Sequence, residues 1–122
     1  MKKKILIIDD DEKHLLATKE ILENEGYEVL VHDLGFGSTN LIKEVQPDLV
    51  LLDINMPGLS GDRLAALLKE NRYTRHTAVI FYSSNDEQSL REAVRKTGIQ
   101  GYICKGDMIR LREQVSFYLG QI

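Results

Sequence analysis

Acidic residues directly follow two short apolar runs in this chain of 122 residues. Asp9 and Asp10 come after residues 5–8, and Asp53 comes after residues 49–52. Each run is too short for a buried helix and is typical of a strand in a sheet that is covered on both faces. In open α/β sheets, ligands bind beyond the carboxyl ends of the strands, so these carboxylates stand where chemistry usually occurs. Asp also commonly starts a turn, and Asp53 taken alone fits either interpretation equally well.

A hydroxyl and an amine are expected at the same edge of the sheet. Ser83 directly follows the predicted strand 78–82, and Lys105 directly follows the predicted strand 101–104. Clustered carboxylates repel one another, so without a counter-ion at least one tends to hold its proton. Mg²⁺ prefers oxygen ligands and keeps several waters, so it would remove that cost and leave room for a substrate oxygen. The alternative is a set of unrelated turn and cap residues, which would require four strand ends to coincide by chance.

The positions of the apolar residues predict the elements that hold these side chains. Five apolar runs alternate with five amphipathic segments, without a linker, repeat or low-complexity stretch between them. Strands separated by helices imply right-handed crossovers, hence a doubly wound, three-layer α/β domain over residues 1–122 with a five-stranded parallel sheet. Asn85 and Gln88 have the spacing of a cap before the fourth helix. The remaining predicted strand covers residues 27–31. The first predicted helix covers residues 12–25 and is closed by Gly26, and the fourth is closed by Gly98. The predicted inward positions are, in the first helix, Leu15, Thr18, Ile21 and Leu22; in the second, Leu41, Ile42 and Val45; in the third, Leu64, Leu67 and Leu68; in the fourth, Leu90, Ala93 and Val94; and in the fifth, Met108, Leu111, Val115, Tyr118 and Leu119.

Composition excludes several classes of function. The net charge is −3 and residues 2–4 form the only basic block, which gives no case for nucleic-acid binding. No apolar stretch approaches the ~20 residues of a membrane span, and nothing resembles a signal peptide. A lone cysteine, Cys104, cannot form an internal disulfide and indicates a reducing cytoplasm. The three histidines, His14, His32 and His76, lack the spacing of metal ligands and are interpreted as surface or packing residues.

In combination, residues 5–11, 48–61 and 101–105 resemble the receiver domains of two-component response regulators. The resemblance covers essentially the whole chain and is far more specific than any one segment. It implies a flavodoxin-like (βα)₅ fold with the strand order 2-1-3-4-5. It also implies a phosphoacceptor that catalyses only its own phosphorylation and dephosphorylation, not an enzyme with a separate substrate.

The resemblance implies a role for each acidic residue. Asp53 would accept the phosphoryl group from a phosphohistidine on a sensor histidine kinase or a histidine phosphotransfer protein. Asp10 would bind Mg²⁺ directly, with Asp9 acting largely through water. Asp53 and the backbone carbonyl of Asn55 would complete the protein ligands of the metal. Phosphoryl transfer depends mainly on alignment and charge neutralisation, which suits such a site.

The residues that would carry the signal also have counterparts here. Ser83 matches the family's Thr/Ser switch position, Lys105 its lysine, and Tyr102 its aromatic switch position. A phosphoryl group adds about −1.5 to −2 charge units and strong acceptors. The resemblance implies that the hydroxyl then moves toward it and the aromatic ring turns inward, changing an output surface within residues 86–119. A tyrosine that merely places its ring on an edge strand is the simpler alternative for Tyr102.

The chain departs from the family pattern at two places. Gly106 follows Lys105 where the family usually has a proline joined by a cis bond. A non-proline cis bond costs ~2.5–4 kcal/mol, so we expect a trans bond and a loop that is looser or differently shaped than usual. Residues 82–84 replace an aliphatic–Thr–Ala pattern but keep the hydroxyl and a small neighbour. Asn55 and Asn85 occupy the two positions that tune water access to the acyl phosphate in this family.

Three other functions fit the sequence less well. Residues 35–40 are close to a dinucleotide fingerprint, but they follow the second strand and lack the third glycine. An FMN site would need a phosphate-binding loop after the first strand, where residues 9–11 would repel the phosphate. A phosphatase that forms an aspartyl phosphate would need an acid where Asn55 stands.

The stronger rival is a receiver-like adaptor that signals by docking without phosphorylation, which Gly106 leaves open. No output domain follows the last predicted helix. We therefore expect either a single-domain regulator that acts on a protein target or a piece of a longer chain. Met1 fits a natural start, whereas Ile122 is compatible with a cut as well as with a natural end.

Overall fold

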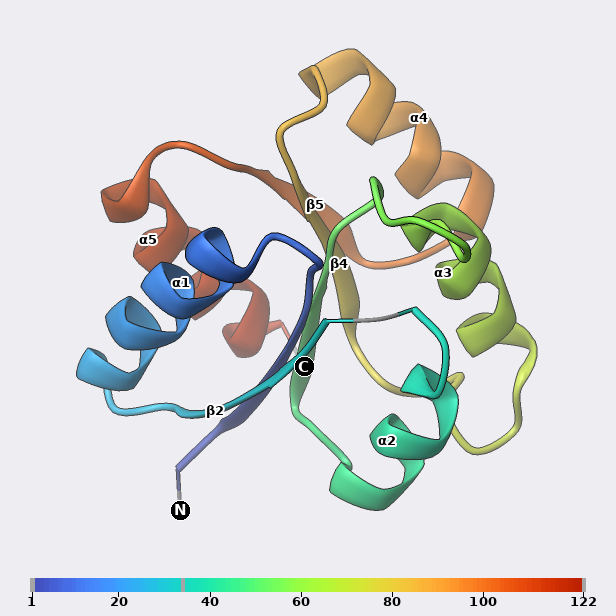
Figure 1. Cartoon of the computed structure of the whole chain (residues 1–122), viewed down its shortest axis with the longest axis horizontal. Coiled ribbons are helices and arrows are strands. Elements are labelled where there is room, and N and C mark those ends of the chain that lie inside the picture. The colour runs from blue at the N-terminus through green and yellow to red at the C-terminus, as the bar shows by residue number, and fades with distance from the viewer. Residues whose placement is uncertain (1, 34, 122) are drawn as a thin grey trace.

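Five parallel strands form one sheet in the order β2-β1-β3-β4-β5, and helices cover both of its faces (Figure 1). This confirms the predicted doubly wound α/β fold and its flavodoxin-like strand order. The computed structural model describes residues 2–33 and 35–121, and Met1 and Ile122, which bear on the expectation about the chain ends, lie outside these ranges. The strands are β1 (Lys4–Ile8), β2 (Glu28–His32), β3 (Leu49–Leu52), β4 (Val79–Ser83) and β5 (Gly101–Cys104), and the helices are α1 (Glu12–Asn24), α2 (Ser38–Val45), α3 (Gly61–Glu70), α4 (Glu87–Thr97) and α5 (Met108–Gly120).

The central strand β3 is apolar at every position because both faces of the sheet are covered. Successive side chains of a strand point to opposite faces. In β3, Leu49 and Leu51 pack against α1 and α5, whereas Val50 and Leu52 pack against α2, α3 and α4. All four residues of β3 are fully buried. The two resulting core layers fix the position of β3, and therefore of the residue that follows it.

The structure corrects some details of the predicted elements. Leu67 was expected to face inward, but it is 49% exposed. The buried stripe of α3 instead runs through Gly61, Leu64, Ala65 and Leu68 and leaves Leu67 on the side turned to solvent. No helix within the described residues is both long enough and apolar enough to cross a membrane.

The start of α4 also differs from the prediction. Asp86, not Asn85, caps this helix, because its carboxylate accepts the backbone N–H of Ser89 at 2.9 Å. Strands β2 and β4 each begin and end one residue later than predicted, so Ser83 is the last residue of β4 rather than the first after it. The predicted closing glycine of α4 is confirmed, since Gly98 takes a left-handed conformation with φ of 75°.

Candidate functional site

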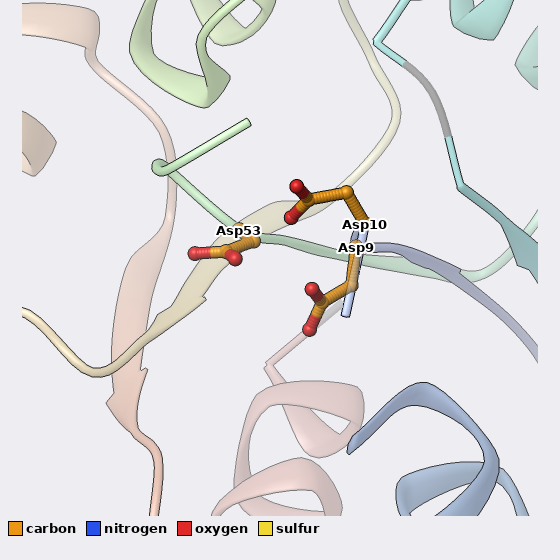
Figure 2. A group of neighbouring side chains, drawn as sticks. All are labelled: Asp9, Asp10 and Asp53. Carbon is orange, nitrogen blue, oxygen red and sulfur yellow. The ribbon is translucent and has the colours of Figure 1, made fainter. Parts of the chain in front are cut away.

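Three carboxylates meet at the carboxyl edge of the sheet (Figure 2). Asp9 and Asp10 follow β1, and Asp53 follows β3. These strands are paired in parallel, with Ile8 opposite Leu52, so the residues after them are brought side by side. One oxygen of each carboxylate lies within 4.8 Å of the others. The structure therefore brings together acids that are more than forty positions apart in the sequence.

The three acids differ in their surroundings. Asp9 is 1% exposed, and its Oδ1 accepts the backbone N–H of Asp11 at 2.9 Å. Asp53 is 5% exposed, and its Oδ1 accepts the backbone N–H of Asn55 at 3.2 Å. Asp10 is exposed and makes no hydrogen bond or ion pair with the residues that the structure describes. Asp10 thus has both oxygens available for an external cation, whereas Asp9 is already engaged by the protein.

Lys105 connects the two buried acids. Its Nζ donates to Asp9 Oδ2 at 2.7 Å and to Asp53 Oδ2 at 3.3 Å. The lysine follows β5, and its backbone N–H donates to the carbonyl of Ser83 at 2.9 Å, which continues the pairing of β4 with β5. Its side chain is only 10% exposed, so this ammonium is held inside the site.

Burial and the neighbouring charges shift the pKa values of Asp53 and Lys105. Burial raises the pKa of Asp53, and the neighbouring Asp9 raises it further, while Lys105 and the N–H of Asn55 act in the opposite direction. Burial alone would lower the pKa of Lys105, but its hydrogen bond to Asp9 and the charge of Asp53 outweigh burial and raise it. One ammonium among three carboxylates leaves excess negative charge, which a divalent cation with oxygen ligands would neutralise.

Ser83 takes part in a hydrogen-bonded bridge over the site. Its buried Oγ accepts from Asn55 Nδ2 at 3.5 Å and from the backbone N–H of Asn85 at 3.3 Å. Asn55 Nδ2 also donates to Asn85 Oδ1 at 2.6 Å. These contacts tie the loop after β3 directly to the loop after β4. The Ser83 hydroxyl therefore lies beside the loop that carries Asp53.

The loop after Asp53 is tightly packed against it. The N–H of Gly61 donates to the carbonyl of Ile54 at 2.8 Å and closes the loop. A Cβ atom at position 61 would lie 2.0 Å from the backbone oxygen of Asp53, a distance that no side chain can occupy. Glycine at the start of α3 is therefore needed for the backbone of Asp53 to keep its position.

Tyr102 points away from the carboxylates and toward α4. Its hydroxyl donates to Glu87 Oε1 at 2.6 Å and accepts from Arg91 Nε at 3.1 Å. The hydrogen bond from Tyr102, together with the charge of Arg91, lowers the pKa of Glu87. The structure thus gives the predicted aromatic switch residue an outward position, held by two charged side chains of α4.

The bond between Lys105 and Gly106 is trans, as expected for a non-proline residue. Gly106 has φ of 122°, a left-handed conformation that strongly favours glycine. The expectation that this loop is looser or differently shaped than usual stays a prediction.

Sequence reasoning missed a second polar group beside the carboxylates. His14 was interpreted only as a surface or packing residue, but its Nδ1 lies 3.7 Å from Asp9 Oδ2. The buried Thr18 and Tyr82 are in contact with the same ring. Burial, and next the charge of Lys105, lower the pKa of His14, and burial raises the pKa of Tyr82. Two features of the sequence could have indicated this cluster: a histidine in the first helical turn after the acidic pair, and a tyrosine in a mostly apolar strand.

Comparison with known proteins agrees with this geometry. A family model described as the response regulator receiver domain matches residues 5–116. The polar-differentiation response regulator DivK of Brucella ovis is 31% identical over 121 residues, and the match covers 98% of each chain. The structure of a CheY-like response regulator receiver domain protein from Methanospirillum hungatei JF-1 superposes with a TM-score of 0.87 at 29% identity, covering 99% of this chain and 96% of that one.

A further solved structure shares the fold at lower identity. It is the receiver domain of the sensor histidine kinase PA1611 from Pseudomonas aeruginosa PAO1, which was crystallised with a magnesium ion coordinated in its active site cleft. It superposes with a TM-score of 0.86 at 21% identity and covers 98% of this chain and 99% of that one. Because the family model spans most of the sequence and the DivK match runs nearly from end to end, this chain belongs to the response regulator receiver domains of two-component systems.

Proposed function

We propose that residues 1–122 act as one receiver domain whose phosphoacceptor is Asp53. The donor is the phosphohistidine of a sensor histidine kinase or a histidine phosphotransfer protein, and the transfer requires Mg²⁺. The observation that carries this proposal is the Lys105 ammonium, which joins the buried Asp9 and Asp53 next to the exposed Asp10. Such an arrangement keeps an acceptor carboxylate close to a fixed cation and to an open position for a metal.

The donor set suits Mg²⁺. Asp10 and Asp53 would bind it through their carboxylates, Asn55 through its backbone carbonyl, and Asp9 largely through water. When bound, the ion neutralises charge on the transferring phosphoryl oxygens and orients them. The free oxygens of Asp10 support this assignment, and so does the magnesium ion in the cleft of the Pseudomonas receiver domain.

The side chains of the site supply the rest of the chemistry. A carboxylate oxygen of Asp53 attacks phosphorus, and the bond from phosphorus to the donor imidazole breaks with its electron pair returning to nitrogen. The Lys105 ammonium and the Ser83 hydroxyl donate to the phosphoryl oxygens, which carry most of the charge. Hydrolysis of the aspartyl phosphate later returns the carboxylate, so the protein acts only on itself.

The signal leaves through the surface formed by α4, β5 and α5. In the structure Ser83 Oγ is held by Asn55 and Asn85, and Tyr102 is held by Glu87. A phosphoryl group on Asp53 offers Ser83 a stronger acceptor, and the space that its movement vacates allows Tyr102 to turn inward. The partner would be a protein target or an output domain that reads this surface in the cytoplasm, where the free Cys104 stays reduced.

The test is phosphorylation by a small donor. The purified chain is incubated with acetyl phosphate and Mg²⁺, and its intact mass is measured. We expect the mass gain of one phosphoryl group in the native chain and in the control Asp62→Asn, which changes an exposed acid of α3. No gain is expected in Asp53→Asn or with EDTA. If the native chain gains no mass yet binds its partner, the adaptor that signals by docking alone is the correct function.

A further inference from the structure

A polar cluster lies next to the carboxylates, between α1 and β4. His14 Nε2 is 3.4 Å from the hydroxyl of Tyr82, and His14 Nδ1 is 3.4 Å from Thr18 Oγ1. Thr18 and Tyr82 also contact each other, with 3.5 Å between their oxygens. Both are almost fully buried, so these contacts hold the histidine ring in one orientation. The same Nδ1 lies 3.7 Å from Asp9 Oδ2.

The Thr18 hydroxyl can donate to Nδ1 or accept from it, so the charge of the nearby Asp9 decides which tautomer of the neutral ring is favoured. An unprotonated Nδ1 would turn a lone pair toward the carboxylate of Asp9, which is unfavourable. A protonated Nδ1 places a donor there and leaves Nε2 to accept from Tyr82. The phenol of Tyr82 keeps its proton because it is buried, so it can act as that donor. A hydrogen bond to one ring nitrogen commonly fixes which of the two carries the proton.

The oxygen that His14 faces is also the oxygen that Lys105 binds. Lys105 Nζ lies 2.7 Å from Asp9 Oδ2 and farther, at 3.3 Å, from Asp53. To neutralise a phosphoryl group on Asp53, the ammonium must shift toward that residue and loosen its contact with Asp9. A buried carboxylate that loses a charged partner is costly. A ring shift of roughly 0.5 Å would bring His14 Nδ1 within hydrogen-bond distance of the released oxygen.

We propose that His14 is a positioning residue of the phosphoacceptor site. Its Nδ1–H orients Asp9 Oδ2 beside the Mg²⁺ position and keeps holding that oxygen when Lys105 moves toward the phosphoryl group, while Tyr82 keeps the ring in the required tautomer. This inference rests on the proposed function and adds a role for three residues that no part of that function uses. Asp9 Oδ2 thus has two alternative donors: His14, which belongs to α1, and Lys105, which can follow the phosphoryl group.

The first test is spectroscopic and needs neither metal nor phosphorylation. Nitrogen-15 NMR of the metal-free protein, at a pH where the rings are neutral, reports which ring nitrogen is protonated. The His14 signals are assigned by their loss in His14→Asn. We expect His14 to be protonated at Nδ1 in the native chain and to become a mixture of tautomers in Tyr82→Phe. Protonation at Nε2 in the native chain would overturn the proposal.

The second test compares two amides at position 14. Asparagine places its amide near the position of Nδ1, whereas glutamine places it near that of Nε2. We expect His14→Gln and His14→Ala to weaken Mg²⁺ binding about tenfold, and His14→Asn to stay within about threefold of the native chain. Isothermal titration measures the dissociation constant, and His76→Ala, which changes an exposed histidine outside the cluster, serves as the control.

These outcomes separate the two proposals. Equal Mg²⁺ affinities in His14→Asn and His14→Gln would overturn the role of His14, and this comparison holds even if His14→Ala fails to fold. The proposed function fails separately, if the native chain binds Mg²⁺ but takes no phosphoryl group from acetyl phosphate.

Discussion

The ammonium of Lys105 lies closer to Asp9, at 2.7 Å, than to Asp53, at 3.3 Å. The cation of the site is therefore bound more closely by Asp9 than by the proposed phosphoacceptor, Asp53. Asp53 consequently remains a buried carboxylate that is only partly compensated, and its pKa is raised. This uncompensated negative charge favours the binding of a second cation at the site.

Removal of the Asp53 charge should stabilise the metal-free fold. We expect Asp53→Asn to raise the free energy of unfolding in EDTA by about 1 kcal/mol or more, because it removes a poorly compensated buried charge. Urea unfolding followed by circular dichroism measures the effect. Mg²⁺ should narrow the difference in unfolding free energy between the two chains, because it binds and stabilises only the chain that keeps Asp53. Asp62→Asn should change little, and a loss of stability in Asp53→Asn would contradict the interpretation.

The difference in unfolding free energy between the native chain and Asp53→Asn should increase with pH. The folded-state pKa of Asp53 is raised, so the native state binds this proton more tightly than the unfolded chain does. The destabilising effect of Asp53 is therefore absent below the ordinary aspartate pKa, grows as the pH rises through the interval up to the folded-state pKa, and is constant above it. We expect native and Asp53→Asn chains to be equally stable at the acidic end and to diverge across that interval. A gap that widens on acidification would show the opposite sign.

Loss of the Lys105 ammonium should slow phosphorylation. We expect Lys105→Met to reduce the rate with acetyl phosphate about 100-fold, because one fixed donor to the phosphoryl oxygens is gone. The rate is followed by intact mass over time at saturating Mg²⁺. Lys13→Met, which changes an exposed lysine of α1, is the matched control and should react at the native rate. An unchanged rate in Lys105→Met would remove this residue from the proposed chemistry.

Tyr102 should be released by a change on α4. Its hydroxyl donates to Glu87 at 2.6 Å, so Glu87→Ala removes the shorter of the two hydrogen bonds that hold the ring outward. We expect the Tyr102 ring signals in carbon-13 NMR of the unphosphorylated variant to move toward their positions in the phosphorylated native chain. Glu113→Ala, at an exposed position of α5, should leave them in place. Signals that shift on phosphorylation but not in Glu87→Ala would show that this contact does not restrain the ring.

Gly61 should tolerate no side chain. An added Cβ would meet the Asp53 carbonyl oxygen at 2.0 Å, and the contact is with backbone, which cannot move aside cheaply. We expect Gly61→Ala to lower the free energy of unfolding by about 2–3 kcal/mol and to impair phosphorylation by displacing Asp53. Gly120→Ala is the control, because no heavy atom lies within 4 Å of its added Cβ. Equal stability of the two variants in urea would contradict the close approach.

The sequence by itself determined the layers and the edge at which the acids meet. Buried parallel strands are marked by consecutive apolar residues such as 49–52, and all strands of a parallel sheet end at one edge, so the residues that follow them must share it. The strand order came from the resemblance to receiver domains, since hydrophobic periodicity carries no information about which strands are neighbours. The exposure of Leu67 was misjudged because periodicity does not fix which side of a helix is covered. The cap of α4 was placed one residue too early because Asn and Asp are both favoured at the N-cap.

Only the tertiary structure decided the contacts between side chains from different elements. Lys105 is shared unequally between Asp9 and Asp53, and Asn55 bridges to Asn85; both contacts join segments that are distant in sequence. His14 lies beside Asp9 because of a side-chain direction that sequence spacing does not specify. Hydrophobic patterning acts along one chain direction and sets which face is buried. Distances of a few ångströms between polar atoms depend on register and on how the helices pack against the sheet, and these are properties of the folded molecule as a whole.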